Sequence, residues 1–295
     1  MAKVLLVVNP SSGGEKAEEF QEMAREKLAQ HFEEVIVKHT EKAGDASDFA
    51  KAAAKEHFEA VFVMGGDGTV NEGISGLAEE DYRPKFGFFP LGTVNDLARA
   101  LQMPLDPAEA IQSLDLTKTK SLDVGKINSS YFMNVVGIGT IPQAVNDTTV
   151  EEKTKLGKFA YFLSAFKNLA ANQSYHFTVE LDGVKKDIES STILIGLTNS
   201  VGGFEQLLPD AKVSDGLLHF LYLKDSNLLE SLQTIPSLVT GVDESNDRVG
   251  YHQVKEVKIA VTDSETSLQV NIDGDEGDEL PVDIRVLPSH LQVYA

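Results

Sequence analysis

The residues best suited to chemistry in this sequence lie in a glycine-rich turn, Gly65-Gly66-Asp67-Gly68-Thr69. The turn follows an apolar run, residues 61–64, which predicts a buried strand of a parallel sheet. Thr69 is a residue type that favours helix N-caps, so we expect a helix to begin there. The free N–H groups and the dipole at such a helix N-terminus favour a bound anion such as a phosphate. A single turn of this kind is more often only a connection between a strand and a helix.

Two further turns have the same character. The segment Asn9-Pro10-Ser11-Ser12-Gly13 follows an apolar run at 3–8, and the segment Gly92-Thr93-Val94-Asn95 follows a run at 85–90. Thr93 or Asn95 is placed to cap the next helix. Neither turn is a Walker A loop, because the pattern Gly-x-x-x-x-Gly-Lys-Ser/Thr does not occur in the sequence. Since the carboxyl ends of parallel strands meet at one edge of a sheet, we expect the three turns to form one ligand site.

The segments that carry these turns alternate between strand and helix patterns. Strands are predicted at 3–8, 35–39, 61–64 and 85–90, with helical patterns at 15–32, 45–58 and 69–77 between them. This alternation predicts a parallel sheet with right-handed crossovers.

Beyond residue 125 the pattern becomes that of a β domain. Helices are predicted only at 151–171 and 227–239, and strands are predicted at 131–136, 175–181, 192–198, 217–223, 255–261 and 267–272. Turn residues such as Asp182-Gly183 indicate antiparallel pairing. We therefore predict an α/β chain with an N-terminal doubly wound parallel-sheet domain (1–125), a C-terminal antiparallel β-sandwich-like domain (126–283) and a cleft between them. Residues 284–295 are expected to return to the first domain.

Composition excludes several classes of protein. The chain of 295 residues has 42% hydrophobic residues and no cysteine, so disulfides, thiolate metal sites and a cysteine nucleophile are ruled out. Its net charge of −20 argues against nucleic acid as a partner, because that binding depends on neutralising phosphates. The N-terminal apolar run is too short for a signal peptide and no run reaches membrane-spanning length, so we expect a cytoplasmic protein.

The three turns, in this order and spacing, resemble the diacylglycerol kinase catalytic-domain family, and the small soluble bacterial lipid kinases in particular. The matching patterns are Asn-Pro-x-Ser-Gly-Gly, Gly-Gly-Asp-Gly-Thr-x-Asn-Glu and Pro-Leu-Gly-Thr-x-Asn-Asp-Leu-Ala-Arg. The resemblance continues through Asn199-Ser200-Val201-Gly202-Gly203-Phe204, the segment 208–218 and Asp273-Gly274-Asp275, so it covers nearly the whole chain. It implies an ATP- and Mg²⁺-dependent kinase that phosphorylates the hydroxyl of diacylglycerol or a related lipid.

The resemblance also implies roles for single residues. Asp67 matches an essential aspartate that works through Mg²⁺, and Asp273 matches the proposed general base. A structural Mg²⁺ site matches Lys212 and Leu217, through their carbonyls, and Asp215. We expect Asp67 and Asp215 to come from separate domains. The positions that match the nucleotide site are Asn9, Pro10, Ser11, Ser12, Gly13, Thr40, Gly66, Asp67, Gly68, Thr69, Val70, Asn71, Glu72, Thr93 and Asn95.

One departure from the family concerns its last motif. The family usually has Asp-Gly-Glu, whereas this chain has Asp273-Gly274-Asp275, which shortens the third side chain by one methylene. Asp275 is therefore the second candidate for the catalytic base, after Asp273, and Glu276 is a substitute for it. Without the resemblance, the acidic segment 273–279 reads as a solvated loop and Asp215 as a turn residue.

A lipid substrate requires contact with a membrane surface. Lys153, Lys155, Lys158 and Lys167 alternate with apolar residues in the predicted helix, so the region 153–167 is a candidate for transient peripheral membrane contact. A helix packed on the β domain, with its lysines in water, explains the same pattern equally well. An oligomer is compatible with the sequence, which does not indicate its size.

Two other functions are compatible with parts of the sequence. NAD kinase shares the Gly-Gly-Asp-Gly-Thr turn but not the Asn-Pro-x-Ser-Gly-Gly or Asn-Asp-Leu-Ala-Arg segments. A non-catalytic lipid- or nucleotide-binding regulator is supported only by the altered last motif. The sequence does not identify the acceptor lipid.

Overall fold

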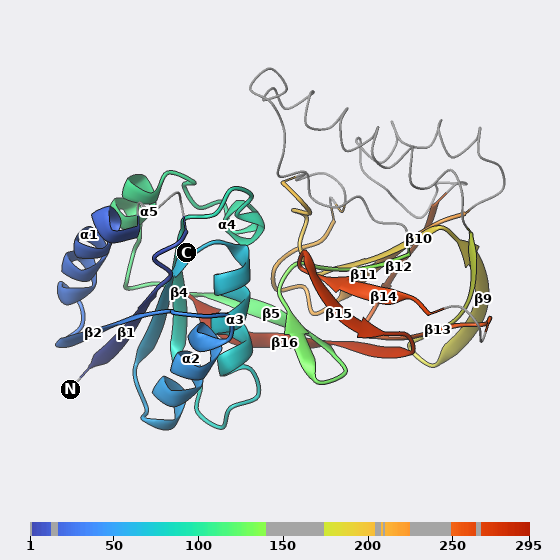
Figure 1. Cartoon of the computed structure of the whole chain (residues 1–295), viewed down its shortest axis with the longest axis horizontal. Coiled ribbons are helices and arrows are strands. Elements are labelled where there is room, and N and C mark those ends of the chain that lie inside the picture. The colour runs from blue at the N-terminus through green and yellow to red at the C-terminus, as the bar shows by residue number, and fades with distance from the viewer. Residues whose placement is uncertain are drawn as a thin grey trace, which may run out of the picture. The chain divides into compact units, whose positions relative to one another are not determined.

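The computed structural model describes residues 2–12, 17–139, 174–203, 208, 210–224, 249–263 and 267–295. The chain forms two compact units that interleave along the sequence (Figure 1). Unit 1 comprises Met1–Met133, Lys212–Gly216 and Leu287–Ala295, and unit 2 comprises Asn134–Ala211 and Leu217–Val286. The domains predicted from the sequence were contiguous, apart from the C-terminal segment.

Unit 1 is built on parallel strands flanked by helices. Its elements are β1 (Lys3–Val8), α1 (Ala17–Ala29), β2 (Glu34–His39), α2 (Asp45–Lys55), β3 (Ala60–Gly65), α3 (Asp67–Leu77), β4 (Lys85–Pro90), α4 (Asp96–Ala100), α5 (Pro107–Ser113), β5 (Lys120–Ile127) and β6 (Ser130–Phe132). The parallel strand order is β2-β1-β3-β4, and helices α1 and α5 lie on one face with α2 and α3 on the other (Figure 1). The predicted doubly wound arrangement is confirmed.

The strands form where the apolar runs are, because parallel strands covered by helices on both faces must be apolar throughout. All six residues of β3 are buried, and so are five of the six in β1 and in β4. The C-terminal end of β16 (Val282–Val293) extends this sheet, with Val293 paired in parallel with Phe86 of β4. The Tyr294 ring, 1% exposed, stacks on Phe62 with 5.4 Å between ring centroids.

The helix starts differ from those we predicted. Helix α3 begins at Asp67, and its N-cap is Gly66, so Thr69 lies inside the helix. Asn95 is the N-cap of α4 but makes no side-chain cap hydrogen bond. At the start of α4 the N–H groups of Asn95 and Asp96 are bonded by the side chain of Asp67, which is distant in sequence, so Asn95 does not cap this helix with its own side chain.

Unit 2 consists of two antiparallel sheets. Its elements are β7 (Val135–Gly139), β8 (Tyr175–Leu181), β9 (Val184–Ser190), β10 (Thr192–Gly196), β11 (Leu218–Leu223), β12 (Val249–Val254), β13 (Glu256–Val261), β14 (Gln269–Ile272), β15 (Asp275–Glu279) and the first residues of β16. One sheet has the order β12-β11-β10-β7-β14-β15, and the other pairs β16 with β13, β13 with β8 and β8 with β9. The predicted antiparallel, β-sandwich-like class is confirmed.

Two differences from the predicted β pattern concern residues of the candidate site. The strand predicted at 131–136 is broken into β6 and β7, because the Asn134 carbonyl accepts the Leu197 N–H (2.8 Å) while its own N–H bonds the Asp273 side chain. The acidic segment expected as a loop forms β15, the edge strand of its sheet. The helices predicted at 151–171 and 227–239 lie outside the described residues. No helix among the residues described here is long and apolar enough to cross a membrane.

Candidate active site

The glycine turns after β3 and β4 lie against each other. A Cβ atom on Gly92 would stand 2.9 Å from the Gly66 Cα, and one on Gly66 would stand 3.3 Å from the Gly92 Cα. Only residues without side chains allow backbones to approach so closely. By contrast, a Cβ on Gly68 would meet no described residue within 4 Å outside the backbone of its own helix. The N-terminus of α3 therefore combines a capping residue without a side chain, Gly66, with open space at Gly68.

The turn after β1 is tied to the same helix. Asn9 Nδ2 donates a hydrogen bond to Thr69 Oγ1 (2.9 Å), while its Oδ1 accepts from the N–H and the hydroxyl of Ser11 (3.1 and 2.8 Å). The Ser12 N–H donates to the Asn9 carbonyl (3.2 Å). The three predicted turns are therefore in contact with one another or with α3, through Asn9, Gly66 and Gly92. Gly13 lies outside the described residues.

Asp67 holds the first residues of α4 in place. Its Oδ2 accepts the Asn95 N–H (2.8 Å) and its Oδ1 accepts the Asp96 N–H (2.9 Å). Burial raises the pKa of the Asp67 carboxyl and the charge of Asp96 adds to this shift, whereas the two N–H donors oppose it. The carboxylate predicted to act in catalysis therefore also joins the turns after β3 and β4.

The other predicted nucleotide-binding residues of unit 1 have mixed surroundings. Thr93 is exposed, and Val70 is buried in the first turns of α3. The Asn95 side chain closes its own turn, since Oδ1 accepts the Gly92 N–H (2.9 Å) and Nδ2 donates to the Gly92 carbonyl (2.8 Å). Asn71 Oδ1 is buried and has no hydrogen-bond partner among the described residues.

Two more of these residues lie on the side of α2. The Thr40 N–H donates to the Val8 carbonyl (2.9 Å), which places Thr40 directly beyond β2. Glu72 Oε2 accepts the N–H of Ala46 (3.2 Å), at the start of α2. The turn after β3 is therefore connected to the segment after β2 as well.

The predicted metal ligands Lys212 and Asp215 form a tight turn in unit 1. Asp215 Oδ2 accepts the Lys212 N–H (2.9 Å), and the Asp215 N–H donates to the Lys212 carbonyl (3.3 Å). Leu217 follows but belongs to unit 2. Since Asp67 and Asp215 lie in the same unit, the expectation that they come from separate domains is wrong. No group of three or more His, Cys, Asp or Glu within the described ranges is arranged to hold a metal ion.

Asp123 of β5 is a buried carboxylate that we did not predict as part of the site. It is 1% exposed, and its oxygens accept the N–H groups of Gly216 and Ser289 (both 2.6 Å), while its own N–H donates to the Val213 carbonyl (2.8 Å). Burial raises the pKa of the Asp123 carboxyl, and the charge of Asp215 adds to the shift. The signal in the sequence was an aspartate in the apolar run Leu122-Asp123-Val124, because charged residues in buried strands need specific partners.

Asp273 forms a hairpin turn in unit 2. Asp273 and Gly274 both have positive φ (52° and 103°) and connect β14 to β15, the geometry of a type I′ turn. Asp273 Oδ1 accepts the N–H groups of Asn134 (3.0 Å) and Val135 (2.8 Å), which fixes the carboxylate at the start of β7. Asp275 pairs with Ile272 and Glu276 with Asn271, so these two exposed carboxylates project from opposite faces of β15.

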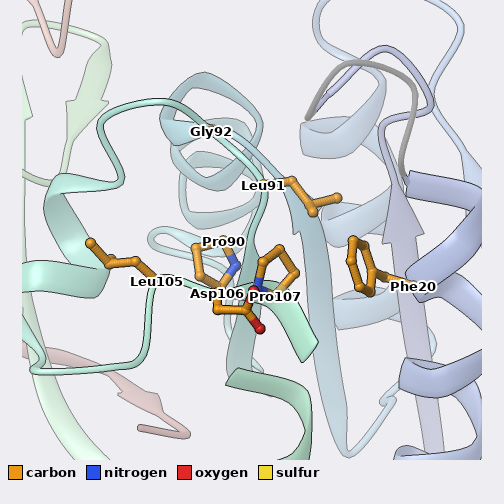
Figure 2. Close-up of a pocket in the computed structure, with 7 residues that line it drawn as sticks. All are labelled: Phe20, Pro90, Leu91, Gly92, Leu105, Asp106 and Pro107. Carbon is orange, nitrogen blue, oxygen red and sulfur yellow. The ribbon is translucent and has the colours of Figure 1, made fainter. Parts of the chain in front are cut away.

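A cavity of about 240 Å³ lies beside the turn after β4, on the side of α1 (Figure 2). It is lined by Phe20, Pro90, Leu91, Gly92, Leu105, Asp106 and Pro107. The only charged residue in this lining, Asp106, accepts the Glu109 N–H (2.9 Å) as the N-cap of α5. The cavity contains no cluster of reactive side chains, and it shares only the Gly92 turn with the predicted site.

Comparisons with known proteins agree with this arrangement. The model of the diacylglycerol kinase catalytic domain matches residues 3–127, and that of the YegS C-terminal NAD kinase beta sandwich-like domain matches residues 134–295. The chain belongs to the diacylglycerol kinase-like family of lipid kinases.

Individual relatives match along almost their whole length. A Staphylococcus aureus protein named diacylglycerol kinase is 36% identical, with 98% of this chain and 91% of the relative covered. A Streptococcus pneumoniae protein named "Putative lipid kinase" is 38% identical, with 100% and 98% covered. A crystal structure titled as a "putative diacylglycerol kinase" from Bacillus anthracis is 29% identical with a TM-score of 0.84, and it covers 100% of this chain and 95% of its own.

Proposed function

We propose that this protein is an ATP- and Mg²⁺-dependent lipid kinase that transfers the γ-phosphoryl group of ATP to the hydroxyl of diacylglycerol or a related lipid. The observation that carries the proposal is the N-terminus of α3, where glycine turns from two strands meet and the described residues leave open space at Gly68. Helix N-termini of this kind bind phosphate groups through backbone N–H donors. Family membership supports the same class of reaction.

The residues around this helix N-terminus fit a nucleotide phosphate chain. Gly66 offers no side chain that competes for the N–H groups of α3, and Gly68 presents no Cβ to the ligand. Asn71 Oδ1 has no partner among the described residues and is an acceptor, so a phosphate oxygen would not satisfy it, whereas a hydroxyl or amino group of a bound nucleotide would. Asp67 keeps the turns after β3 and β4 at a fixed spacing, because its carboxylate accepts the N–H groups of Asn95 and Asp96.

Lys212 and Asp215 are the residues we propose for Mg²⁺. Their carbonyl and carboxylate oxygens are the hard donors that Mg²⁺ prefers, and a bound cation would relieve the repulsion between Asp215 and Asp123. When bound, Mg²⁺ supplies positive charge that offsets the charge of the transferring phosphoryl group.

Asp273 is the residue we propose as general base. In the reaction the acceptor hydroxyl oxygen bonds the γ-phosphorus, the bond to the ADP oxygen breaks, and the hydroxyl proton passes to the Asp273 carboxylate. The two N–H donors on Oδ1 keep this carboxylate oriented. Asp275 is the second candidate for the base.

We also propose that the protein works in the cytoplasm and contacts the membrane surface only transiently, through the region 153–167. This part of the proposal rests on the four lysines and the apolar residues between them in the sequence. An oligomer remains compatible with the proposal.

A labelled-phosphate assay with a panel of acceptors tests the proposal. The full-length protein is incubated with γ-labelled ATP, Mg²⁺ and either diacylglycerol, phosphatidylglycerol, polyprenol, a long-chain base or NAD. Transfer to a lipid and not to NAD supports a lipid kinase and identifies its acceptor. Label on NAD would favour an NAD kinase, whereas ATP binding without any labelled product would indicate a non-catalytic regulator.

A further inference from the structure

Helix α2 begins without a capping side chain of its own. Its N-cap is Gly44, which has φ 89°, and no side-chain cap hydrogen bond forms there. The acceptor for the Ala46 N–H comes from another helix, since Glu72 Oε2 of α3 lies 3.2 Å from that nitrogen. A carboxylate at a helix N-terminus also interacts favourably with the helix dipole. Glu72 thus supplies the cap that Gly44 cannot provide.

The start of α2 in turn fixes the segment that carries Thr40. Asp45, the first residue of α2, accepts the N–H groups of Glu41 (2.7 Å) and Lys42 (2.9 Å) through Oδ2. The Thr40 N–H is itself bonded to the Val8 carbonyl (2.9 Å). Whatever holds the first turn of α2 therefore also holds the chain between Thr40 and that helix.

Helices α2 and α3 touch closely beside this contact. A Cβ on Gly76 would lie 2.2 Å from the Ser47 carbonyl oxygen, so only glycine allows this spacing. Glu72 and Gly76 are four residues apart and lie on the same face of α3. The face of α3 that meets α2 therefore includes both the close backbone contact at Gly76 and the hydrogen bond between Glu72 and the Ala46 N–H, which we call the Glu72 clasp.

We propose that Glu72 is a positioning residue that joins two separate parts of the nucleotide site: Thr40 after β2 and the glycine turn after β3. The inference rests on the proposed kinase function, and it changes the role of Glu72 from a nucleotide contact to a support. A carboxylate next to a polyphosphate would be repelled by it, whereas its bond to the Ala46 N–H is favourable. Because β1 lies between β2 and β3, the clasp is a second connection between these two segments.

The test compares Glu72→Ala and Glu72→Met, which both remove the acceptor, with Glu72→Gln, which keeps one. We measure the Kd of an ATP analogue, KM for ATP and for the lipid, kcat, and hydrogen exchange of the Ala46 amide. Removing the acceptor should raise the Kd and KM for nucleotide about fivefold, as loss of one such bond does, and speed exchange at Ala46. Neither kcat nor the KM for lipid should change. Glu72→Gln should restore the Kd and the KM for nucleotide to the wild-type values.

The inference is overturned if Glu72→Gln is as impaired as Glu72→Ala, because the charge itself would then act on the ligand. It is also overturned if nucleotide affinity is unchanged when the acceptor is removed. Glu26→Ala, at an exposed position on α1, serves as the control and should match the wild type. Failure of the kinase proposal would appear separately, as a wild-type protein that transfers no phosphate to any lipid.

Discussion

The Asp67 carboxylate accepts the N–H groups of Asn95 and Asp96, which lie 28 and 29 positions further along the chain. It therefore has a structural role in addition to the catalytic role that we predict for it. Substitution of Asp67 should affect folding as well as activity, and the two effects must be measured separately.

We predict that Asp67→Ala lowers the free energy of unfolding by about 1–3 kcal/mol, because two partly buried N–H groups lose their acceptor. Asp67→Asn should cost less, since its amide retains one acceptor oxygen. Urea denaturation measures both effects. Asp81→Ala, at an exposed position, is the control and should stay within about 0.5 kcal/mol of the wild type. Equal stability of Asp67→Ala and Asp81→Ala would contradict the assigned role.

His290 makes the stability of unit 1 dependent on pH. Its Nε2 accepts the Glu79 N–H (3.1 Å), which requires a neutral ring nitrogen. Burial lowers the pKa of His290, and the nearby charges of Arg83 and Lys126 lower it further, while Glu79 acts against the shift. A histidine whose pKa is lowered by folding contributes stability above its unfolded pKa of about 6.5, and this stability is lost as the pH falls.

We predict that the wild-type protein loses stability between pH 7.5 and pH 5.5, and that His290→Gln reduces this loss. Glutamine offers an acceptor oxygen but does not titrate in this range. Urea unfolding of both proteins at the two pH values measures the difference. An identical pH dependence in the variant would show that His290 is not responsible.

At the scale of elements, the parallel strands of unit 1 could be predicted because each is a short apolar run that ends in a glycine turn. β4 was predicted with the observed bounds, and so was β1. β9 was not predicted, because only Ile188 and Ser190 of its seven residues are buried and its pattern does not alternate clearly. β15 was missed because an exposed acidic strand is held by its pairing with β14, which the local sequence does not indicate.

Capping could not be predicted from local sequence for a similar reason. Local rules consider the residues next to a helix start, whereas Asp67 and Glu72 satisfy helix N–H groups more than 20 residues away. The placement of Lys212–Gly216 in unit 1 is equally non-local, since Asp123 holds this segment through Gly216 and Val213. The motifs predict the residues of the candidate site but not the hydrogen bonds between them.

Two glycines of α3 should respond in opposite ways to substitution by alanine. Gly76→Ala places a Cβ against the Ser47 carbonyl and should destabilise the protein by about 1–3 kcal/mol.

Gly68→Ala meets open space among the described residues and should stabilise α3 by up to about 1 kcal/mol, since alanine is the better helix former. The same Gly68→Ala should weaken nucleotide binding, because the methyl group occupies the proposed phosphate site. Thermal unfolding and titration with an ATP analogue measure these effects, and unchanged nucleotide affinity in Gly68→Ala would argue against this site.

At the scale of the whole molecule, a net charge of −20 opposes adsorption to anionic membranes. The proposed membrane contact must therefore come from a local concentration of lysines. Reversal of Lys153, Lys155, Lys158 and Lys167 to glutamate should reduce binding to anionic vesicles at least tenfold, because each lysine near such a surface contributes about 1 kcal/mol. Activity towards a short-chain, water-soluble diacylglycerol should remain.

Vesicle sedimentation measures this binding. Lys118→Glu and Lys185→Glu change the net charge in the same direction, at side chains that are 79% and 76% exposed, and serve as controls that should bind nearly as well as the wild type. Equal loss in the controls would mean that total charge, and not the region 153–167, governs membrane contact.

Mg²⁺-dependent transfer of labelled γ-phosphate to diacylglycerol in mixed micelles, measured with wild-type protein and Asp67→Ala, decides whether this protein is a lipid kinase. We predict a phosphorylated lipid product for the wild type and a rate at least about a hundredfold lower for Asp67→Ala, as expected when a preorganised charged group is lost. Near-normal transfer by Asp67→Ala, or no transfer by the wild type to any lipid acceptor, would contradict it.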